Sequence, residues 1–167
     1  MKKNIVLIGM TGSGKTTLAR LISEHIRPHM KLINLDNYLE QQEGKKVSEL
    51  FKIGEEYFRD LESKAVEKIS REEGVIIDTG GGVIKNPDNI KLLKKNGLIV
   101  FINRPIDKIA KDMDMNRPLL KGGMERLYSL YNERFKIYKN SCDIELLNDK
   151  TPEDALEKLR IILIGEI

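Results

Sequence analysis

The feature that most constrains the fold is a glycine-rich segment near the N-terminus, Gly9-Met10-Thr11-Gly12-Ser13-Gly14-Lys15-Thr16. It directly follows an apolar run, Ile5–Ile8, and a helical pattern begins within it at Lys15. A Gly-x-x-x-x-Gly-Lys-Thr segment between a strand and a helix is the context in which such a segment binds phosphate. Residues 9–16 are named the phosphate loop below.

The residue types of the phosphate loop suit a nucleoside triphosphate. Glycines let the backbone curl so that its N–H groups and the helix N-terminus face the phosphates. Lys15 is expected to reach the terminal phosphoryl group, and Thr16 to ligate Mg²⁺. The sequence lacks the Asn-Lys-x-Asp segment that selects guanine in GTPases, so we expect ATP. The expected nucleotide-binding residues here are Gly12, Ser13, Gly14, Lys15, Thr16 and Thr17.

Apolar runs alternate with helical patterns along the chain and predict an α/β fold. The runs are almost continuously apolar, as in parallel strands that helices cover on both faces, so we expect a three-layer α/β/α sandwich. The predicted strands are Ile5–Ile8, Leu32–Leu35, Val75–Ile77, Leu98–Ile102 and Ile144–Leu147. The predicted helices are about Lys15–Ile26, Ile53–Ser70, Asn89–Lys95, Ile106–Lys111, Met124–Asn140 and Pro152–Ile164.

Two segments add detail to this prediction. The last helix has a start signal, with Thr151 as N-cap, Pro152 at the first helical position and acidic residues after it. The stretch Asp112–Gly123 is the most irregular of the chain and is expected to be a mobile loop. With no linker or repeat, the 167 residues are expected to form a single domain, 1–167.

Composition narrows the function classes. Lysine and arginine total 29 against 26 acidic residues, a net charge of +3 without a basic block, so nucleic acid is not the expected partner. A single cysteine, Cys142, allows no intrachain disulfide and suits a reducing cytoplasm. No apolar run is long enough for a signal peptide core or a membrane span. We expect a cytoplasmic protein, acting as a monomer.

Several short motifs follow in order along the chain, and together they resemble shikimate kinase. They are Asp36, Phe58-Arg59-Asp60-Leu61-Glu62, Asp78-Thr79-Gly80-Gly81-Gly82, Arg117-Pro118-Leu119-Leu120 and residues 130–138. The resemblance implies a fold like that of nucleoside monophosphate kinases, with a parallel sheet of strand order 2-3-1-4-5 and a lid at about 112–123. It implies transfer of the γ-phosphoryl group of ATP to the 3-hydroxyl of shikimate, in aromatic amino-acid biosynthesis.

The resemblance also assigns residues in a substrate-binding region at about 34–62 and beyond it. Shikimate carries a carboxylate and three hydroxyls, and guanidinium groups and a carboxylate acceptor complement these. Asp36, Arg59, Gly81, Gly82 and Arg134 are the implied substrate-binding residues. The implied catalytic residues are Asp36, Lys15 and the lid residue Arg117, which also contacts the phosphates. Alternatively, Arg59 forms a surface ion pair with Glu62, and Arg134 is an exposed helix arginine.

The chain departs from the family pattern at two places. The family usually has Asp-x-Asp after the second strand, whereas this chain has Asn34-Leu35-Asp36, so one acidic group near the magnesium ion is missing. We expect Asp78, with Thr16, to restore that charge; the alternative is that Asp78 caps the turn. In the lid, the family commonly has an arginine that stacks on adenine, whereas this chain has Ala110-Lys111-Asp112 in that region. On the adenine side, Lys150 stands where the family often has another arginine.

Two other functions remain open from the sequence. The same loop and carboxylate would serve another small-molecule kinase, of the gluconate or nucleoside monophosphate type. Asn34 would also suit a nucleotide-binding regulatory module without turnover. The paired arginines and the triple glycine favour shikimate, and the retained Lys15, Thr16 and Asp36 favour catalysis. ATP and shikimate are thus the expected partners, with Mg²⁺ as cofactor and no membrane.

Overall fold

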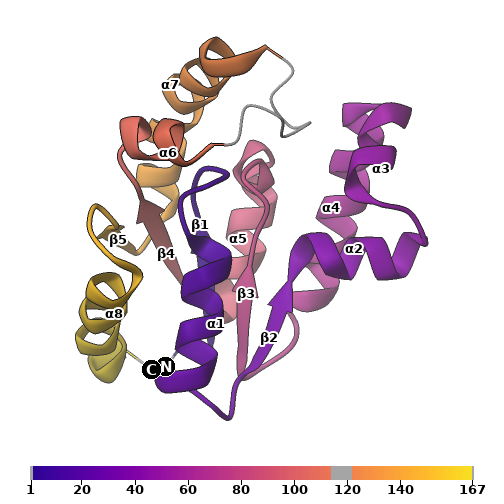
Figure 1. Cartoon of the computed structure of the whole chain (residues 1–167). Helices are drawn as coiled ribbons and strands as arrows, with labels where there is room; N and C mark the ends of the chain where they lie inside the picture. The colour runs from indigo at the N-terminus through magenta and orange to yellow at the C-terminus, as the bar shows by residue number, and fades with distance from the viewer. Residues whose placement is uncertain (1, 114–121, 167) are drawn as a thin grey trace.

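A computed structural model describes residues 2–113 and 122–166 of the chain (Figure 1). Its centre is a parallel sheet of five strands in the order β2-β3-β1-β4-β5. This order and the three-layer arrangement confirm the predicted fold class. The strands are β1 (Asn4–Ile8), β2 (Lys31–Asn34), β3 (Val75–Asp78), β4 (Gly97–Asn103) and β5 (Ile144–Leu147).

Helices cover both faces of the sheet and bury two apolar cores. Successive strand residues point to opposite faces, so Ile5 and Leu7 of β1 pack in one core while Val6 and Ile8 pack in the other. The first core is closed by α1 (Lys15–His25) and α8 (Pro152–Glu166). The other face carries α2 (Leu35–Glu43), α3 (Val47–Ile53), α4 (Glu55–Ile69), α5 (Pro87–Asn96), α6 (Ile106–Asp112) and α7 (Gly123–Ser141). A short 3₁₀ helix, η1 (Val83–Lys85), follows β3.

The prediction was wrong between residues 35 and 54. Leu35 belongs to helix α2 rather than to a strand, because the Asn34 side chain accepts a hydrogen bond from the Asn37 N–H and caps the helix there. Two short helices, α2 and α3, were missed, and the helix predicted from Ile53 begins at Glu55. The start signal of α8 is confirmed, since the Asp154 N–H donates to Thr151 Oγ1.

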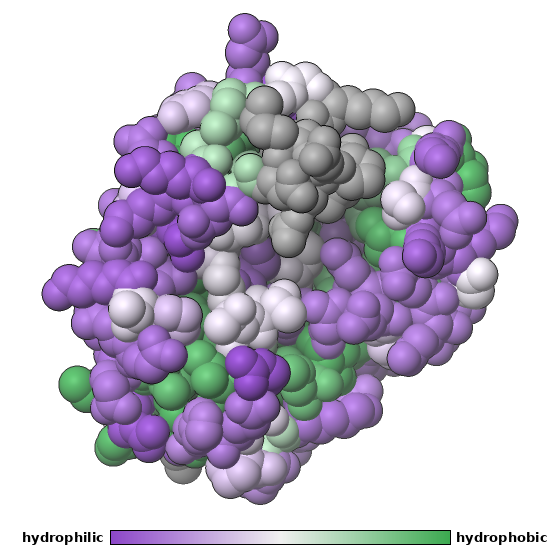
Figure 2. All heavy atoms as spheres, viewed as in Figure 1, coloured by the Kyte–Doolittle hydropathy of each residue, from purple (hydrophilic) through white to green (hydrophobic). Residues whose placement is uncertain are grey.

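The surface seen in Figure 2 is mostly hydrophilic, with apolar patches between the polar side chains. Among the described residues, Ile161 and Ile164 of α8 are the most exposed large apolar ones, at 76% and 72%. Within residues 2–113 and 122–166, no helix combines the length and apolar character needed to cross a membrane.

Candidate active site

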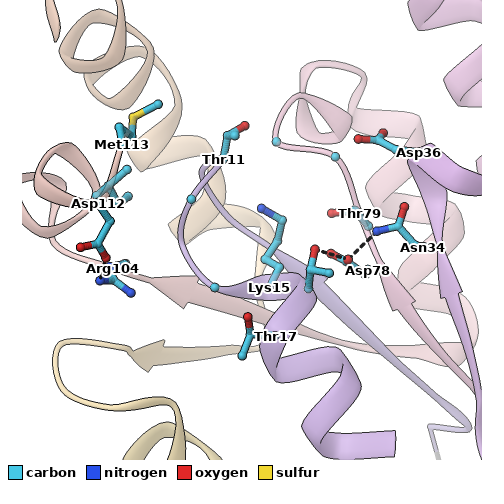
Figure 3. A pocket seen from close by; sticks show the side chains of 16 residues that line it. Thr11, Lys15, Thr17, Asn34, Asp36, Asp78, Thr79, Arg104, Asp112 and Met113 are labelled. Atoms are coloured by element: carbon cyan, nitrogen blue, oxygen red, sulfur yellow. Dashed lines mark hydrogen bonds and ion pairs between the residues drawn. The ribbon is translucent and has the colours of Figure 1, made fainter. Parts of the chain in front are cut away.

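A cleft of about 490 Å³ opens at the carboxyl ends of β1, β2 and β3 (Figure 3). Ligands bind at this edge in open parallel sheets, because the loops that leave neighbouring strands converge there. The phosphate loop lines one side of the cleft, and Asn34, Asp36 and Asp78 line another. Segments that are distant in the sequence thus share one site.

The phosphate loop has left-handed backbone angles that glycine adopts without strain. Gly12 and Gly14 have φ angles of +82° and +97°, which side chains other than glycine rarely adopt. Gly14 also caps the start of α1 without a side chain, so the first turn of the helix can meet an anion.

The Lys15 side chain folds back onto the phosphate loop at the floor of the cleft and is buried, with 7% of the residue's surface exposed. Its Nζ donates to the carbonyl oxygens of Gly9 and Met10, each at 2.8 Å. Burial lowers the pKa of Lys15 to about 8, although the charges of Asp78 and Asp36 act in the opposite direction. The ammonium group is therefore desolvated and, within the described residues, hydrogen-bonded only to neutral carbonyl oxygens. A bound anion would give it a stronger interaction than these carbonyls do.

Asp78 links the phosphate loop to β2. Its Oδ2 accepts hydrogen bonds from Thr16 Oγ1 and from Asn34 Nδ2, both at 2.7 Å (Figure 3). The carboxylate is 2% exposed, at the end of β3. Asn34 therefore has two roles that the sequence analysis missed: it caps α2 with its oxygen and holds Asp78 with its nitrogen.

Asp36 lies in the first turn of α2 and faces the same cleft as Lys15. Burial raises its pKa, and the nearby Asp78 carboxylate raises it further, while Lys15 opposes the shift. A carboxylate with a raised pKa is a stronger proton acceptor than an ordinary one.

The predicted pair of Arg59 and Glu62 exists, with Nη1 and Oε1 2.7 Å apart, but it is not a surface pair. Glu62 is 1% exposed, and Arg59 is only 18% exposed at its side chain. The Arg59 guanidinium also lies over the rings of Phe51 and Phe58. The guanidinium lies close to Gly82, where an added Cβ would be 2.2 Å from Nη2. A side chain at position 82 would therefore displace Arg59 from these contacts.

Arg134 is buried rather than exposed, at 9%, so the alternative of an ordinary surface arginine is wrong. A Cβ on Gly81 would lie 3.5 Å from Arg134 Nη1, which places the guanidinium beside the triple glycine. The Nε of Arg134 is buried and has no hydrogen-bond partner in the described part of the chain. One turn further along α7, the buried Tyr138 donates its hydroxyl to the Gly81 carbonyl at 2.6 Å.

Of the remaining residues predicted to bind the nucleotide, some line the cleft and others do not. Thr17 lines the cleft, whereas Ser13 is buried below it. Lys150 is exposed in the loop between β5 and α8 and is not among the residues lining the cleft. Arg117 lies outside the described residues.

Sequence reasoning missed several residues of the site or its supports. Arg104 follows β4 at the edge of the sheet where ligands bind, a position that could have revealed it, and its ion pair with Asp112 lines the cleft. Asn148 had no comparable signal, because it acts on a backbone carbonyl distant in the sequence. Tyr138 belongs to the motif of residues 130–138, but its hydrogen bond to the Gly81 carbonyl appears only once the chain is folded.

Proteins of known function are similar to this chain both in sequence and in fold. A family model described as shikimate kinase matches residues 11–163. A shikimate kinase of Clostridium botulinum (strain Alaska E43 / Type E3) is 46% identical over 166 residues, which cover 99% of each chain. The solved structure of shikimate kinase from Acinetobacter baumannii in complex with shikimate has a TM-score of 0.88 and 25% identity, covering 100% of this chain and 96% of that chain.

A second solved structure, the shikimate kinase of Aquifex aeolicus vf5, has a TM-score of 0.84 and 33% identity, covering 97% of this chain and 96% of that chain. Similarity therefore extends over nearly the whole length in sequence and in fold, and the resemblance of the short motifs is confirmed. The chain belongs to the shikimate kinase family.

Proposed function

We propose that Asp36 and Lys15 carry out the reaction of this ATP-dependent shikimate kinase, the transfer of the γ-phosphoryl group of ATP to the 3-hydroxyl of shikimate. One observation carries the assignment: both side chains face the cleft above the phosphate loop, and their charges are close enough to shift each other's pKa. Asp36 orients the hydroxyl and accepts its proton. Lys15 exchanges its contacts with loop carbonyls for the terminal phosphate, where it neutralises charge.

The acceptor is held beside Asp36 by two guanidinium groups and the triple glycine. Arg59 and Arg134 bind the carboxylate of shikimate, and the backbone at Gly81 and Gly82 contacts the ligand. Support comes from the burial of Arg134, from the partial burial of Arg59 and from the unpartnered Nε of Arg134, which a carboxylate would satisfy. Glu62 keeps Arg59 extended toward Gly82 before substrate arrives.

ATP phosphates are bound by the phosphate loop and by residues around it. The backbone at Gly12, Ser13 and Gly14, with Thr16 and Thr17, binds the phosphates at the N-terminus of α1. Arg117 contacts the transferring phosphoryl group from the lid, and Lys150 contributes on the adenine side.

Thr16 and Asp78 would hold the Mg²⁺ ion. Both offer hard oxygen ligands, which Mg²⁺ prefers, and their side chains already meet at 2.7 Å, so the residues present fit the metal. When bound, Mg²⁺ neutralises charge that develops on the phosphates. Asp78 supplies the negative charge that Asn34 lacks, and Asn34 Nδ2 keeps the carboxylate turned toward Thr16.

The chain works as one domain, 1–167, with the substrate-binding region at about 34–62 and a lid at about 112–123 that closes over the phosphates. Closure expels water, which protects the γ-phosphate from hydrolysis. The enzyme acts as a monomer in the cytoplasm, a reducing compartment that suits its single cysteine.

A coupled assay of ADP release tests this function with shikimate, gluconate and nucleoside monophosphates as acceptors. We expect turnover with shikimate at least about 10³-fold above the other acceptors, since a site built for several polar groups rejects analogues that leave them unpaired. Preference for gluconate or a nucleotide would establish the other type of small-molecule kinase. ADP binding without turnover on any acceptor would establish a regulatory module.

A further inference from the structure

We propose that Asn148 is a positioning residue for the phosphates of the nucleotide: its side-chain amide orients the peptide between Ser13 and Gly14 so that the Gly14 N–H faces the bound phosphate. The inference rests on the proposed binding of ATP by the phosphate loop. It gives a role to a residue 134 positions beyond Gly14, in the loop that leads from β5 to α8.

The contact is direct and buried. Asn148 Nδ2 donates to the Ser13 carbonyl oxygen at 2.8 Å, and the residue is 4% exposed. A carbonyl oxygen can only accept, so the nitrogen of the amide must face it. Asn148 is itself fixed, because its backbone N–H donates to the Asn103 carbonyl at the end of β4, also at 2.8 Å.

Because a peptide group is planar, the hydrogen bond from Asn148 to the Ser13 carbonyl also fixes the direction of the Gly14 N–H. A trans peptide is planar, with its N–H pointing opposite to its C=O, and the described residues contain no cis peptide. With the Ser13 carbonyl turned toward Asn148, the Gly14 N–H turns away from it. In phosphate loops of this spacing, the backbone N–H groups cradle the phosphates, so Asn148 holds one such group in place before the ligand arrives.

Gly14 allows Asn148 to come this close. A Cβ on Gly14 would lie 2.7 Å from Asn148 Nδ2, a distance that no real side chain tolerates next to a fixed amide. The glycine thus serves the close approach as well as the φ angle of +97°. The Asn148 amide also joins the phosphate loop to the segment that carries Lys150, and so couples the two sides of the nucleotide site.

Titration calorimetry on the full chain tests the inference, with ADP and Mg²⁺ as one probe and shikimate alone as the other. In Asn148→Ala, the Kd for ADP should rise about tenfold, because the Ser13 carbonyl loses a buried partner and the peptide can rotate. In Asn148→Asp, the rise should be larger, since a carboxylate cannot donate to a carbonyl and repels phosphate. The Kd for shikimate should change less than twofold in both variants.

Asn103→Ala is the matched control. The Asn103 side chain also donates one hydrogen bond of 2.7 Å, to Glu145, at the same edge of the sheet, and within the described residues it makes no hydrogen bond to the phosphate loop. This variant should bind ADP like the unmodified chain. The nearly isosteric Asn148→Asp keeps the packing, so it decides the question if Asn148→Ala does not fold.

Two results would overturn the inference. One is a lower melting temperature with an unchanged Kd for ADP, which would make Asn148 a structural residue alone. The other is an equal loss of ADP and shikimate binding, which would indicate general damage to the site. Failure of the proposed nucleotide binding is recognised separately, because the unmodified chain would then bind no ADP, and the inference would fall with it.

Discussion

Replacing Asp78 with asparagine removes the charge proposed to compensate for Asn34 while it keeps the shape of the side chain. The magnitude follows from the hydrogen bond of 2.7 Å between Thr16 Oγ1 and Asp78 Oδ2. A Mg²⁺ ion bound to Thr16 at about 2.1 Å can lie no further than about 4.8 Å from that carboxylate oxygen. At this distance a divalent ion and a unit charge attract by about 7 kcal/mol at an effective dielectric constant of 20, and by about 1.7 kcal/mol even at that of water.

The smaller energy already corresponds to a factor of about 20. We therefore expect Asp78→Asn to raise the Mg²⁺ concentration for half-maximal turnover at least about 20-fold, in a coupled assay at saturating ATP and shikimate. Asp143→Asn is the control, because Asp143 accepts a backbone hydrogen bond from Ile99 at the other end of the sheet. An increase below threefold, alongside a severe effect of Thr16→Ala, would refute the reasoning and leave Asp78 as a turn cap.

Three further predictions concern the reacting groups and their supports. Asp36→Asn should lower turnover by about 10²-fold or more with ADP binding nearly unchanged. It should also raise the melting temperature at neutral pH. The pKa of Asp36 is higher in the folded than in the unfolded chain, so the ionised carboxylate lowers the free energy of unfolding as pH rises. Unchanged turnover would exclude Asp36 from the mechanism. Because the pKa of Lys15 in the free enzyme is about 8, kcat/KM for ATP should fall as pH rises above about 8; a flat profile up to pH 10 would contradict the assignment. Tyr138→Phe should raise KM for shikimate about tenfold with little change in kcat. Tyr128→Phe, on the same helix α7, removes only an exposed hydrogen bond to Asp107 of α6 and should leave KM unchanged.

Much of the fold could be predicted because burial on both faces leaves a strong pattern. Parallel strands such as β1 and β4 are almost wholly apolar, and their order followed from the resemblance. The segment after β2 was misread because Leu35 continues an apolar run while its neighbour Asn34 already caps a helix. Gly44, with a φ angle of +64°, ends that helix after only nine residues, too few for a clear helical period.

Site residues could be predicted where a motif ties chemistry to spacing, as in the phosphate loop, and the family motifs led to the expectation that Asp36, Arg59 and Arg134 bind the acceptor. Burial could not be predicted for the two arginines, because it depends on elements that pack around them: aromatic rings for Arg59 and the triple glycine for Arg134. Asn148 illustrates the limit most clearly. Its partner is a main-chain carbonyl, which carries no identity that a sequence could reveal.

The strand order fixes the distance between the acceptor side and the nucleotide side of the proposed site. Strands β2, β3 and β1 are neighbours, and Asp78 pairs in register with Asn34 on one side and with Leu7 on the other. Adjacent strands lie about 4.8 Å apart, and β3 lies between β2 and β1. The end of β2, where the proposed acceptor binds, is therefore about 10 Å from the end of β1, where the phosphate loop begins. Main-chain hydrogen bonds set that span, and the surrounding loops can change their sequence without altering it.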